Sequence, residues 1–157
     1  MTNDIPNRNY IVAGTKPWNR RIFDEVILQY AGNWFFVNEQ EQLTSAFVKR
    51  INPRYLFFLH WSWLVSDEII NKYECVCFHM TDVPYGRGGS PLQNLISRGH
   101  HQTKMTALQM VHELDAGPVY LKNDLSLEGS AEEIYIRATY LSAEMIDYII
   151  QKQPQPV

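Results

Sequence analysis

Short apolar runs alternate with segments of helical spacing along this chain, and this alternation restricts its fold more than any other feature. The runs are continuous and apolar, as strands buried within a parallel sheet are. They are Tyr10–Ala13, Trp34–Val37, Tyr55–Leu59, Val76–His79, Thr103–Val111 and Val119–Leu127. Strands that alternate with helices form β-α-β units. We therefore predict an α/β fold of Rossmann type, with three layers, a mostly parallel twisted sheet, helices on both faces and later strands that are partly antiparallel.

Proline and capping residues mark the helices between the runs. Pro17 suits the first turn of a helix that continues to Tyr30, and Leu43–Arg50 predicts a second helix. Ser66 can cap a short third helix, and Pro91 opens another after a glycine-rich loop. These helices supply the crossovers that a parallel sheet needs.

The last helix has the clearest start. Ser130 and Glu133 form a capping-box pattern, and apolar residues at helical spacing follow from Ile134 to Ile149. The tail Gln151–Val157 is polar and rich in proline, so we expect it to be flexible. The length, residues 1–157, is close to the usual size of one domain, and we predict a single domain.

Charge and hydropathy disfavour two classes of partner. The net charge is -3, whereas a protein that binds tRNA or DNA usually carries a basic excess, so no nucleic acid partner is expected. No apolar run approaches the roughly 18–20 residues that a membrane span needs, so no membrane association is expected. The start, Met1–Asn9, is polar and lacks a signal-peptide core. With only two cysteines, Cys75 and Cys77, a reducing cytoplasm is the simplest location.

Open α/β sheets bind their ligands beyond the carboxyl ends of the strands. His79 ends a predicted strand there, which suits a general base or an electrostatic stabiliser. Asp115 follows a later strand whose end should lie on the same side, and a carboxylate beside an imidazole raises its proton affinity and orients it. The two suggest an acid-base pair for acyl transfer, hydrolysis or proton abstraction. The alternatives are a structural histidine and, for Asp115, a simple turn former.

Other residues near the same strand ends could bind ligands. Trp61 and Trp63 follow the third strand, where one of them could form a ligand wall rather than core packing. Arg87, in a loop whose Gly88 lets backbone approach a ligand closely, could hold a phosphate or carboxylate, or simply be solvated. Four possible metal ligands lack the usual spacing, so we predict no metal site; they are His60, Cys75, Cys77 and His79.

The segment Cys77–Gly117 resembles the catalytic core of the formyltransferase family. The family's pattern is Asn-x-His, then x-Ser-x-x-Pro, a glycine four residues later, and a strand that ends in Asp-x-Gly. Here it reads as Cys77-Phe78-His79, Thr81, Pro84 and Gly88, then Thr106 through Asp115-Ala116-Gly117. The stretch from Phe78 to Asn94 is most similar to sugar N-formyltransferases of the pseudaminic acid type.

The resemblance implies a formyltransferase-like fold and the transfer of a formyl group from 10-formyltetrahydrofolate to a small-molecule amine. The implied acceptor is an amino sugar or sugar nucleotide of surface-carbohydrate biosynthesis. His79, Asp115 and Cys77 take the catalytic positions. The expected folate pocket comprises Trp61, Trp63, Leu64, Val65, Val111 and Leu114. The residues expected to meet the acceptor are Thr81, Arg87, Gly88 and Lys16.

Departures from related enzymes bear on this expectation, and one is Leu108, which stands where many members carry a second histidine. Cys77 replaces the asparagine that helps to hold the formyl oxygen, and a thiol is a much weaker donor than an amide. Gly14-Thr15-Lys16-Pro17 replaces the phosphate loop of the glycinamide ribonucleotide enzymes, which disfavours that substrate. We also expect no room for the second domain that methionyl-tRNA enzymes use. Hydrolysis of the same folate and non-catalytic binding of folate or a sugar nucleotide remain alternatives.

Overall fold

The computed structural model describes residues 6–84 and 95–157. Within these residues six strands form one sheet in the order β2-β1-β3-β4-β5-β6. The first four are parallel, β5 runs antiparallel to β4, and β6 runs antiparallel to β5. Their bounds are β1 Asn9–Ala13, β2 Asn33–Val37, β3 Tyr55–Phe58, β4 Glu74–His79, β5 Gln102–Gln109 and β6 Val119–Ser126. The predicted mostly parallel sheet with antiparallel later strands is confirmed.

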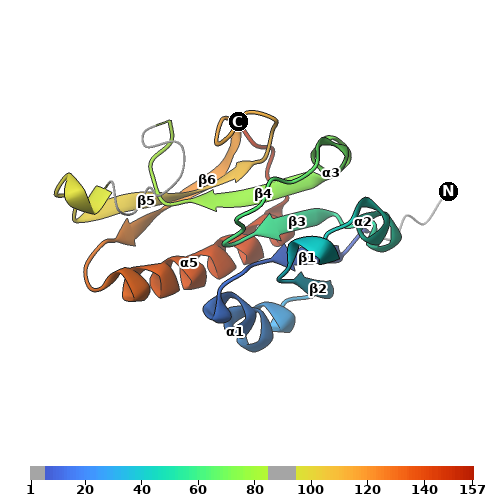
Figure 1. Cartoon of the computed structure of the whole chain (residues 1–157), viewed down its shortest axis with the longest axis horizontal. Coiled ribbons are helices and arrows are strands. Elements are labelled where there is room, and N and C mark those ends of the chain that lie inside the picture. The colour runs from blue at the N-terminus through green and yellow to red at the C-terminus, as the bar shows by residue number, and fades with distance from the viewer. Residues whose placement is uncertain (1–5, 85–94) are drawn as a thin grey trace.

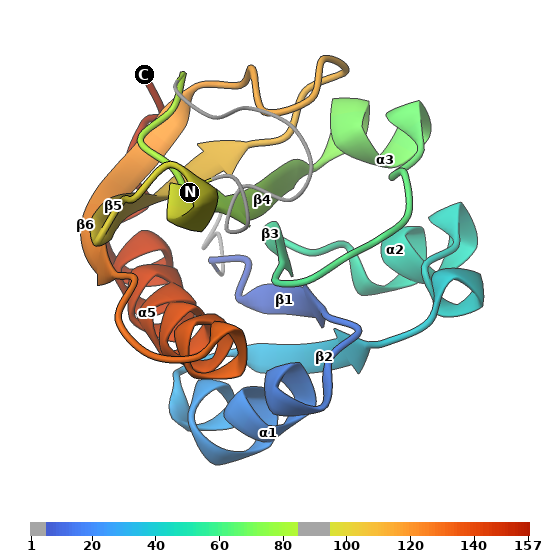
Figure 2. The same ribbon diagram turned by 60° about the vertical axis from the view of Figure 1, so that its left-hand side comes forward.

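Helices cover both faces of this sheet, as predicted (Figures 1 and 2). Helices α1 (Pro17–Glu25) and α5 (Ala131–Lys152) lie on one face, and α2 (Ser45–Ile51) and α3 (Asp67–Lys72) lie on the other. Short 3-10 turns follow α1 and precede α2; they are Ile27–Gln29 and Gln40–Gln42. Among the described residues, no helix combines the length and apolarity needed to cross a bilayer.

The first helix is shorter than predicted. Its apolar spacing predicted a helix from Pro17 to Tyr30, but α1 ends at Glu25 and a separate 3-10 turn follows. Ile27 in that turn is fully buried in the core beside α1. The spacing therefore reports which residues face the core, and it does not distinguish one helix from a helix followed by a turn.

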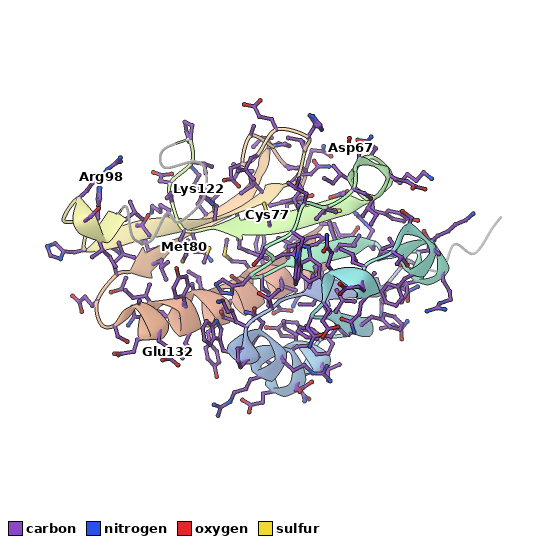
Figure 3. All side chains as sticks on the ribbon, in the orientation of Figure 1. Asp67, Cys77, Met80, Arg98, Lys122 and Glu132 are labelled. Carbon is purple, nitrogen blue, oxygen red and sulfur yellow. The ribbon has the colours of Figure 1, made fainter. Side chains whose placement is uncertain are left out.

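Alternate residues of each parallel strand fill two hydrophobic cores. Val12 and Val76 pack with α1 and α5, whereas Ile11 and Cys75 pack with α2 and α3. Because both faces are buried, these strands are apolar at consecutive positions. Charged side chains such as Glu132 lie at the periphery (Figure 3).

The predicted helix caps are present. The hydroxyl of Ser66 accepts a hydrogen bond from the Ile69 N–H at the start of α3 (3.4 Å). At the start of α5, the Glu133 N–H donates to Ser130 Oγ and the Ser130 N–H donates to Glu133 Oε1, each at 3.2 Å. These bonds satisfy N–H groups that have no partner within the helix.

The residues after α5 turn back to the sheet. Helix α5 runs to Lys152, and Gln153 ends it in a left-handed conformation (φ 44°). Val157 then exchanges two main-chain hydrogen bonds with Val119, at 2.8 and 2.9 Å. Because β6 is an edge strand of the described sheet, its main-chain groups can pair with another segment. Such bonds do not depend on side chains, so a polar sequence can form them.

Candidate active site

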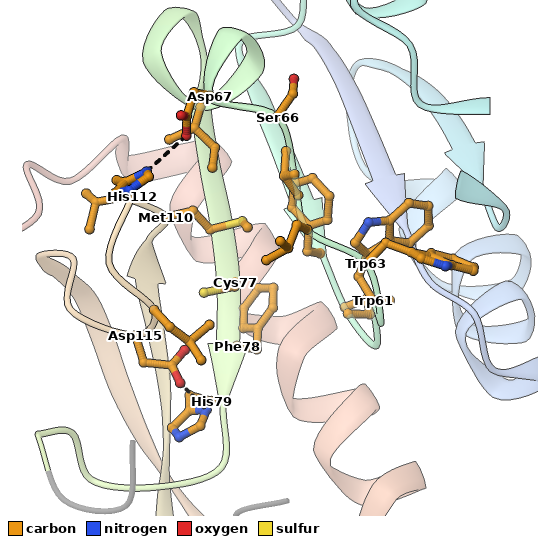
Figure 4. A pocket seen from close by; sticks show the side chains of 17 residues that line it. Trp61, Trp63, Ser66, Asp67, Cys77, Phe78, His79, Met110, His112 and Asp115 are labelled. Carbon is orange, nitrogen blue, oxygen red and sulfur yellow. Dashed lines mark hydrogen bonds and ion pairs between the residues drawn. The ribbon is translucent and has the colours of Figure 1, made fainter. Parts of the chain in front are cut away.

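Strand β4 places His79 at the carboxyl edge of the sheet. His79 is the last residue of β4 and pairs with Thr106 of β5, and the loop from β5 to β6 brings Asp115 beside it. Nδ1 of His79 lies 3.5 Å from Oδ2 of Asp115, and each side chain is only 9% exposed (Figure 4). The structure thus brings together the two residues that the sequence suggested as a pair.

The carboxylate orients the imidazole. At this separation Asp115 favours the ring tautomer that carries a proton on Nδ1 of His79. Asp115 itself has a φ of 53°, in the left-handed region that aspartate enters more readily than most residues. A backbone held in a less common conformation is typical of functional sites.

A glycine allows the loop that carries Asp115 to close. A Cβ added to Gly117 would lie 1.7 Å from the carbonyl oxygen of Gln109, so no larger residue fits there without movement of the backbone. The Gln109 N–H donates to the Pro118 carbonyl at 2.9 Å and holds the two sides of the loop together. The Asp-x-Gly spacing therefore has a steric cause in this fold.

A cavity of about 670 Å³, the first cavity, opens beside the pair on the α2–α3 side of the sheet. In Figure 4, Cys77 and His79 extend from β4 toward the loop that carries Asp115. All six residues expected for the folate pocket line this cavity; they are Trp61, Trp63, Leu64, Val65, Val111 and Leu114. Leu64 is 95% exposed and Leu114 is 65% exposed, so apolar side chains stand uncovered at the cavity wall.

A second cavity, of about 530 Å³, shares His79 with the first. It lies toward the α1–α5 side of the sheet, where Met80 belongs to the core that those helices cover. Its other walls come from the loop after β1, from α1, from the end of β3 and from α5; they include Thr15, Lys16, Trp18, His60 and Tyr135. His79 therefore stands where two cavities meet, which is where a group could pass between two ligands.

Comparisons with known proteins agree with this arrangement. No protein-family model matches the chain. The solved methionyl-tRNA formyltransferase from Clostridium thermocellum is 44% identical to this chain, with a TM-score of 0.87. The match covers 94% of this chain and 66% of the Clostridium chain. The chain belongs to the formyltransferase family.

More distant members of the family extend the comparison. A methionyl-tRNA formyltransferase of Thermotoga neapolitana is 28% identical over 120 residues, which cover 74% of this chain and 38% of the relative. The formyltransferase PseJ from Anoxybacillus kamchatkensis was solved with UDP-4,6-dideoxy-4-formamido-L-AltNAc and tetrahydrofolate. It is 14% identical to this chain, so the likeness shows a shared fold alone. The TM-score is 0.68, and the match covers 94% of this chain and 79% of the PseJ chain. This chain spans little more than a third of the length of the curated relatives that it matches.

The expected closeness to the pseudaminic acid type is not confirmed. The two relatives at 28% and 44% identity are methionyl-tRNA formyltransferases, whereas the sugar enzyme PseJ is 14% identical. The family is thus clear from sequence and fold, and the acceptor is not decided by these likenesses.

Cys77, which the resemblance sets in place of the family's asparagine, lines the first cavity. Burial, with a contribution from the Asp115 carboxylate, raises the pKa of its thiol to about 12. The thiol is therefore neutral near pH 7, and it can offer a ligand only a weak S–H donor. It is also a poor nucleophile, because the thiolate is the reactive form.

The residues expected to meet the acceptor have different surroundings. Lys16 lines the second cavity. Thr81 is fully buried and lines neither cavity, and among residues 6–84 and 95–157 its Oγ1 has no hydrogen-bond partner. Its carbonyl accepts a hydrogen bond from the buried Thr106 hydroxyl at 2.7 Å, which ties the segment after β4 to β5. Arg87 and Gly88 lie outside the described residues.

Several residues of the second cavity were not assigned to a ligand from the sequence, among them His60, Trp18 and Tyr135. His60 directly follows the end of the third predicted strand, and the rule that ligands bind beyond strand ends could have found it. Trp18 and Tyr135 lie on two helices and are 117 residues apart in the sequence, so no local signal marks them as neighbours. Within residues 6–84 and 95–157, no three His, Cys, Asp or Glu side chains gather as metal ligands do.

Proposed function

We propose that this chain transfers a formyl group from 10-formyltetrahydrofolate to a primary amine of an amino sugar or sugar nucleotide in surface-carbohydrate biosynthesis. One observation carries the proposal: His79, which is paired with Asp115, lines both of two ligand-sized cavities. A group transfer needs both partners bound at once, with the reacting atoms close together.

The first cavity suits the folate. Its volume of about 670 Å³ is in the usual range for small-ligand sites, and tryptophan and aliphatic side chains form its walls. A flat pterin packs well against such walls, with Trp61, Trp63, Leu64 and Val65 on one side and Val111 and Leu114 on the other. That PseJ was solved with tetrahydrofolate supports the same cofactor for this fold.

The chemistry requires proton transfer and stabilisation of negative charge. The amine nitrogen attacks the formyl carbon, the bond from that carbon to N10 of the folate breaks, one proton leaves the amine and one arrives on N10. His79 is placed to take up the amine proton or to stabilise the negative oxygen of the tetrahedral intermediate, and Asp115 orients its ring. A donor aimed at such an oxygen contributes roughly 3–4 kcal/mol. Cys77 adds only its neutral thiol.

The second cavity suits a small acceptor. Its volume of about 530 Å³ accommodates a sugar, and Lys16 can meet an acidic group of the acceptor. Arg87 and Gly88 stay in the proposal as further contacts. The net charge of -3 offers no basic excess for tRNA. Methionyl-tRNA is nevertheless the second candidate, because the relatives with 28% and 44% identity carry that name.

Release of tetrahydrofolate from 10-formyltetrahydrofolate tests the proposal. We expect release that depends on a UDP-linked amino sugar, and a fall by about 10²–10⁴-fold in the His79→Asn variant. The matched control is His101→Gln, because His101 is exposed and lines neither cavity. Release driven only by methionyl-tRNA would select the second candidate, release without any amine would indicate a hydrolase, and binding without release would indicate a binding module. A normal rate in the His79 variant would refute the site.

A further inference from the structure

His60 lines the second cavity, and its hydrogen bonding determines which ring nitrogen carries the proton. Asn19 is fully buried, and the main-chain N–H of Lys16 donates to its Oδ1 at 3.0 Å. That bond fixes the direction of the amide, so the Asn19 NH₂ group faces Nδ1 of His60, at 3.0 Å, and donates to it. Nδ1 is then the acceptor, and the proton of the neutral ring is on Nε2.

The surroundings keep the ring neutral and hold its orientation. Burial, together with the nearby Lys16 ammonium, lowers the pKa of His60 to about 4. Trp18 and Tyr135 contact the imidazole edge to face, at centroid distances of 6.1 and 5.4 Å. Within residues 6–84 and 95–157, no hydrogen bond uses Nε2 of His60. His60, which lines the cavity, thus carries an oriented N–H donor that no described residue uses.

The loop after β1 cannot provide main-chain donors instead. The N–H of Gly14 donates to the Val37 carbonyl at 3.0 Å, and the N–H of Thr15 donates to the His60 carbonyl at 2.8 Å. The N–H of Lys16 is used by Asn19. Anion sites at such loops depend on N–H groups that point at the ligand. Because these three are already bonded, the loop from Gly14 to Lys16 offers no main-chain donor to an anionic group in this cavity.

We propose that the Nε2–H of His60 and the ammonium of Lys16 together bind an anionic oxygen of the acceptor, a phosphate or a carboxylate, in the second cavity. The assignment rests on the proposed function, since it gives that cavity to the acceptor. It names the acceptor as an amine that carries an acidic group, and it makes His60 a specificity-determining residue. Asn19 acts through His60 and is a positioning residue.

Two substitutions separate the ligand contact from the internal hydrogen bond. In His60→Asn, the side-chain oxygen can replace Nδ1 as the acceptor for Asn19, but the distal N–H is lost. In His60→Gln, the longer amide can place an N–H near the position of Nε2. A merely structural histidine would favour the Asn variant, whereas a ligand-binding one favours the Gln variant.

Binding of inorganic phosphate and of acetate is measured by calorimetry and by the imidazole ¹⁵N signals of His60. We expect Nε2 to carry the proton and its ¹⁵N signal to shift on titration with one of the two anions. The anion that causes the shift shows whether the cavity recognises a phosphate or a carboxylate. The dissociation constant should rise by about tenfold in His60→Asn and in Lys16→Met, and should stay near the wild-type value in His60→Gln. Tetrahydrofolate binding should be unchanged in all three variants.

The inference is overturned if neither anion shifts the His60 signal, if Nδ1 carries the proton, or if His60→Asn binds the anion as tightly as the wild type. Failure of the proposed function looks different: the anion binds and shifts His60, but no tetrahydrofolate is released with any amine. Denaturation curves for each variant show whether it is folded, and the ¹⁵N experiment on the wild type needs no variant.

Discussion

Acidification from pH 7 to pH 4 should destabilise this protein through His60. Its pKa lies at about 4 in the folded chain, against an ordinary value of 6.5, because burial and the Lys16 ammonium disfavour the charged ring. Between these two values the unfolded chain binds a proton that the folded chain does not bind. Stability is therefore complete above about pH 6.5 and falls as the pH is lowered toward 4.

The size of this effect follows from the two pKa values. At about 1.4 kcal/mol for each pH unit, the interval from 6.5 to about 4 removes about 3 kcal/mol from the free energy of unfolding. That is a large fraction of the total stability of a typical domain. Other groups also titrate in this range, so the wild type alone cannot isolate the contribution of His60.

Urea denaturation of the wild type and of His60→Asn at pH 7 and pH 4 isolates it. The asparagine does not titrate and can still accept a hydrogen bond from Asn19, while all other groups change equally in both proteins. We expect the wild type to lose about 3 kcal/mol more than the variant between the two pH values. Equal losses in the two proteins would show that the folded chain protonates His60 as readily as the unfolded chain does.

Three further predictions concern the first cavity and its loop. Asp115→Asn should leave stability nearly unchanged, because asparagine also tolerates a φ of 53°. It should lower kcat by about 10²–10⁴-fold in the tetrahydrofolate-release assay. A normal kcat would exclude the carboxylate from the chemistry. Gly117→Ala should cost more than about 2 kcal/mol in urea denaturation, since its Cβ would overlap the Gln109 carbonyl, and an unchanged midpoint would contradict the steric argument. Leu64→Ser should change stability by less than about 0.5 kcal/mol, because the side chain is 95% exposed. Calorimetry should nevertheless show tetrahydrofolate binding weakened about tenfold. Unchanged affinity would place Leu64 outside the folate contact.

The sheet and the pairing of His79 with Asp115 could be predicted from the sequence because both depend on local rules. A strand buried on both faces must be apolar at consecutive positions, and this makes the run that ends at His79 visible. Ligands of open sheets bind beyond strand ends. His79 and Asp115 could therefore be placed together, although they are 36 residues apart in the sequence. The Asp-x-Gly spacing added a steric requirement that the structure explains through Gly117.

The second cavity was decided by the tertiary structure alone. The tautomer of His60 depends on the Asn19 amide, whose direction is set by a main-chain N–H. The charge of the ring depends on its burial and on the nearby Lys16 ammonium. The pairing of the tail with Val119 is similar, because main-chain hydrogen bonds carry no residue preference that a sequence can reveal. Local sequence thus determined which segments are buried and which polar groups end the strands. Proton positions, charge states and edge pairing required the packed chain, since they arise from contacts between segments that no periodicity connects.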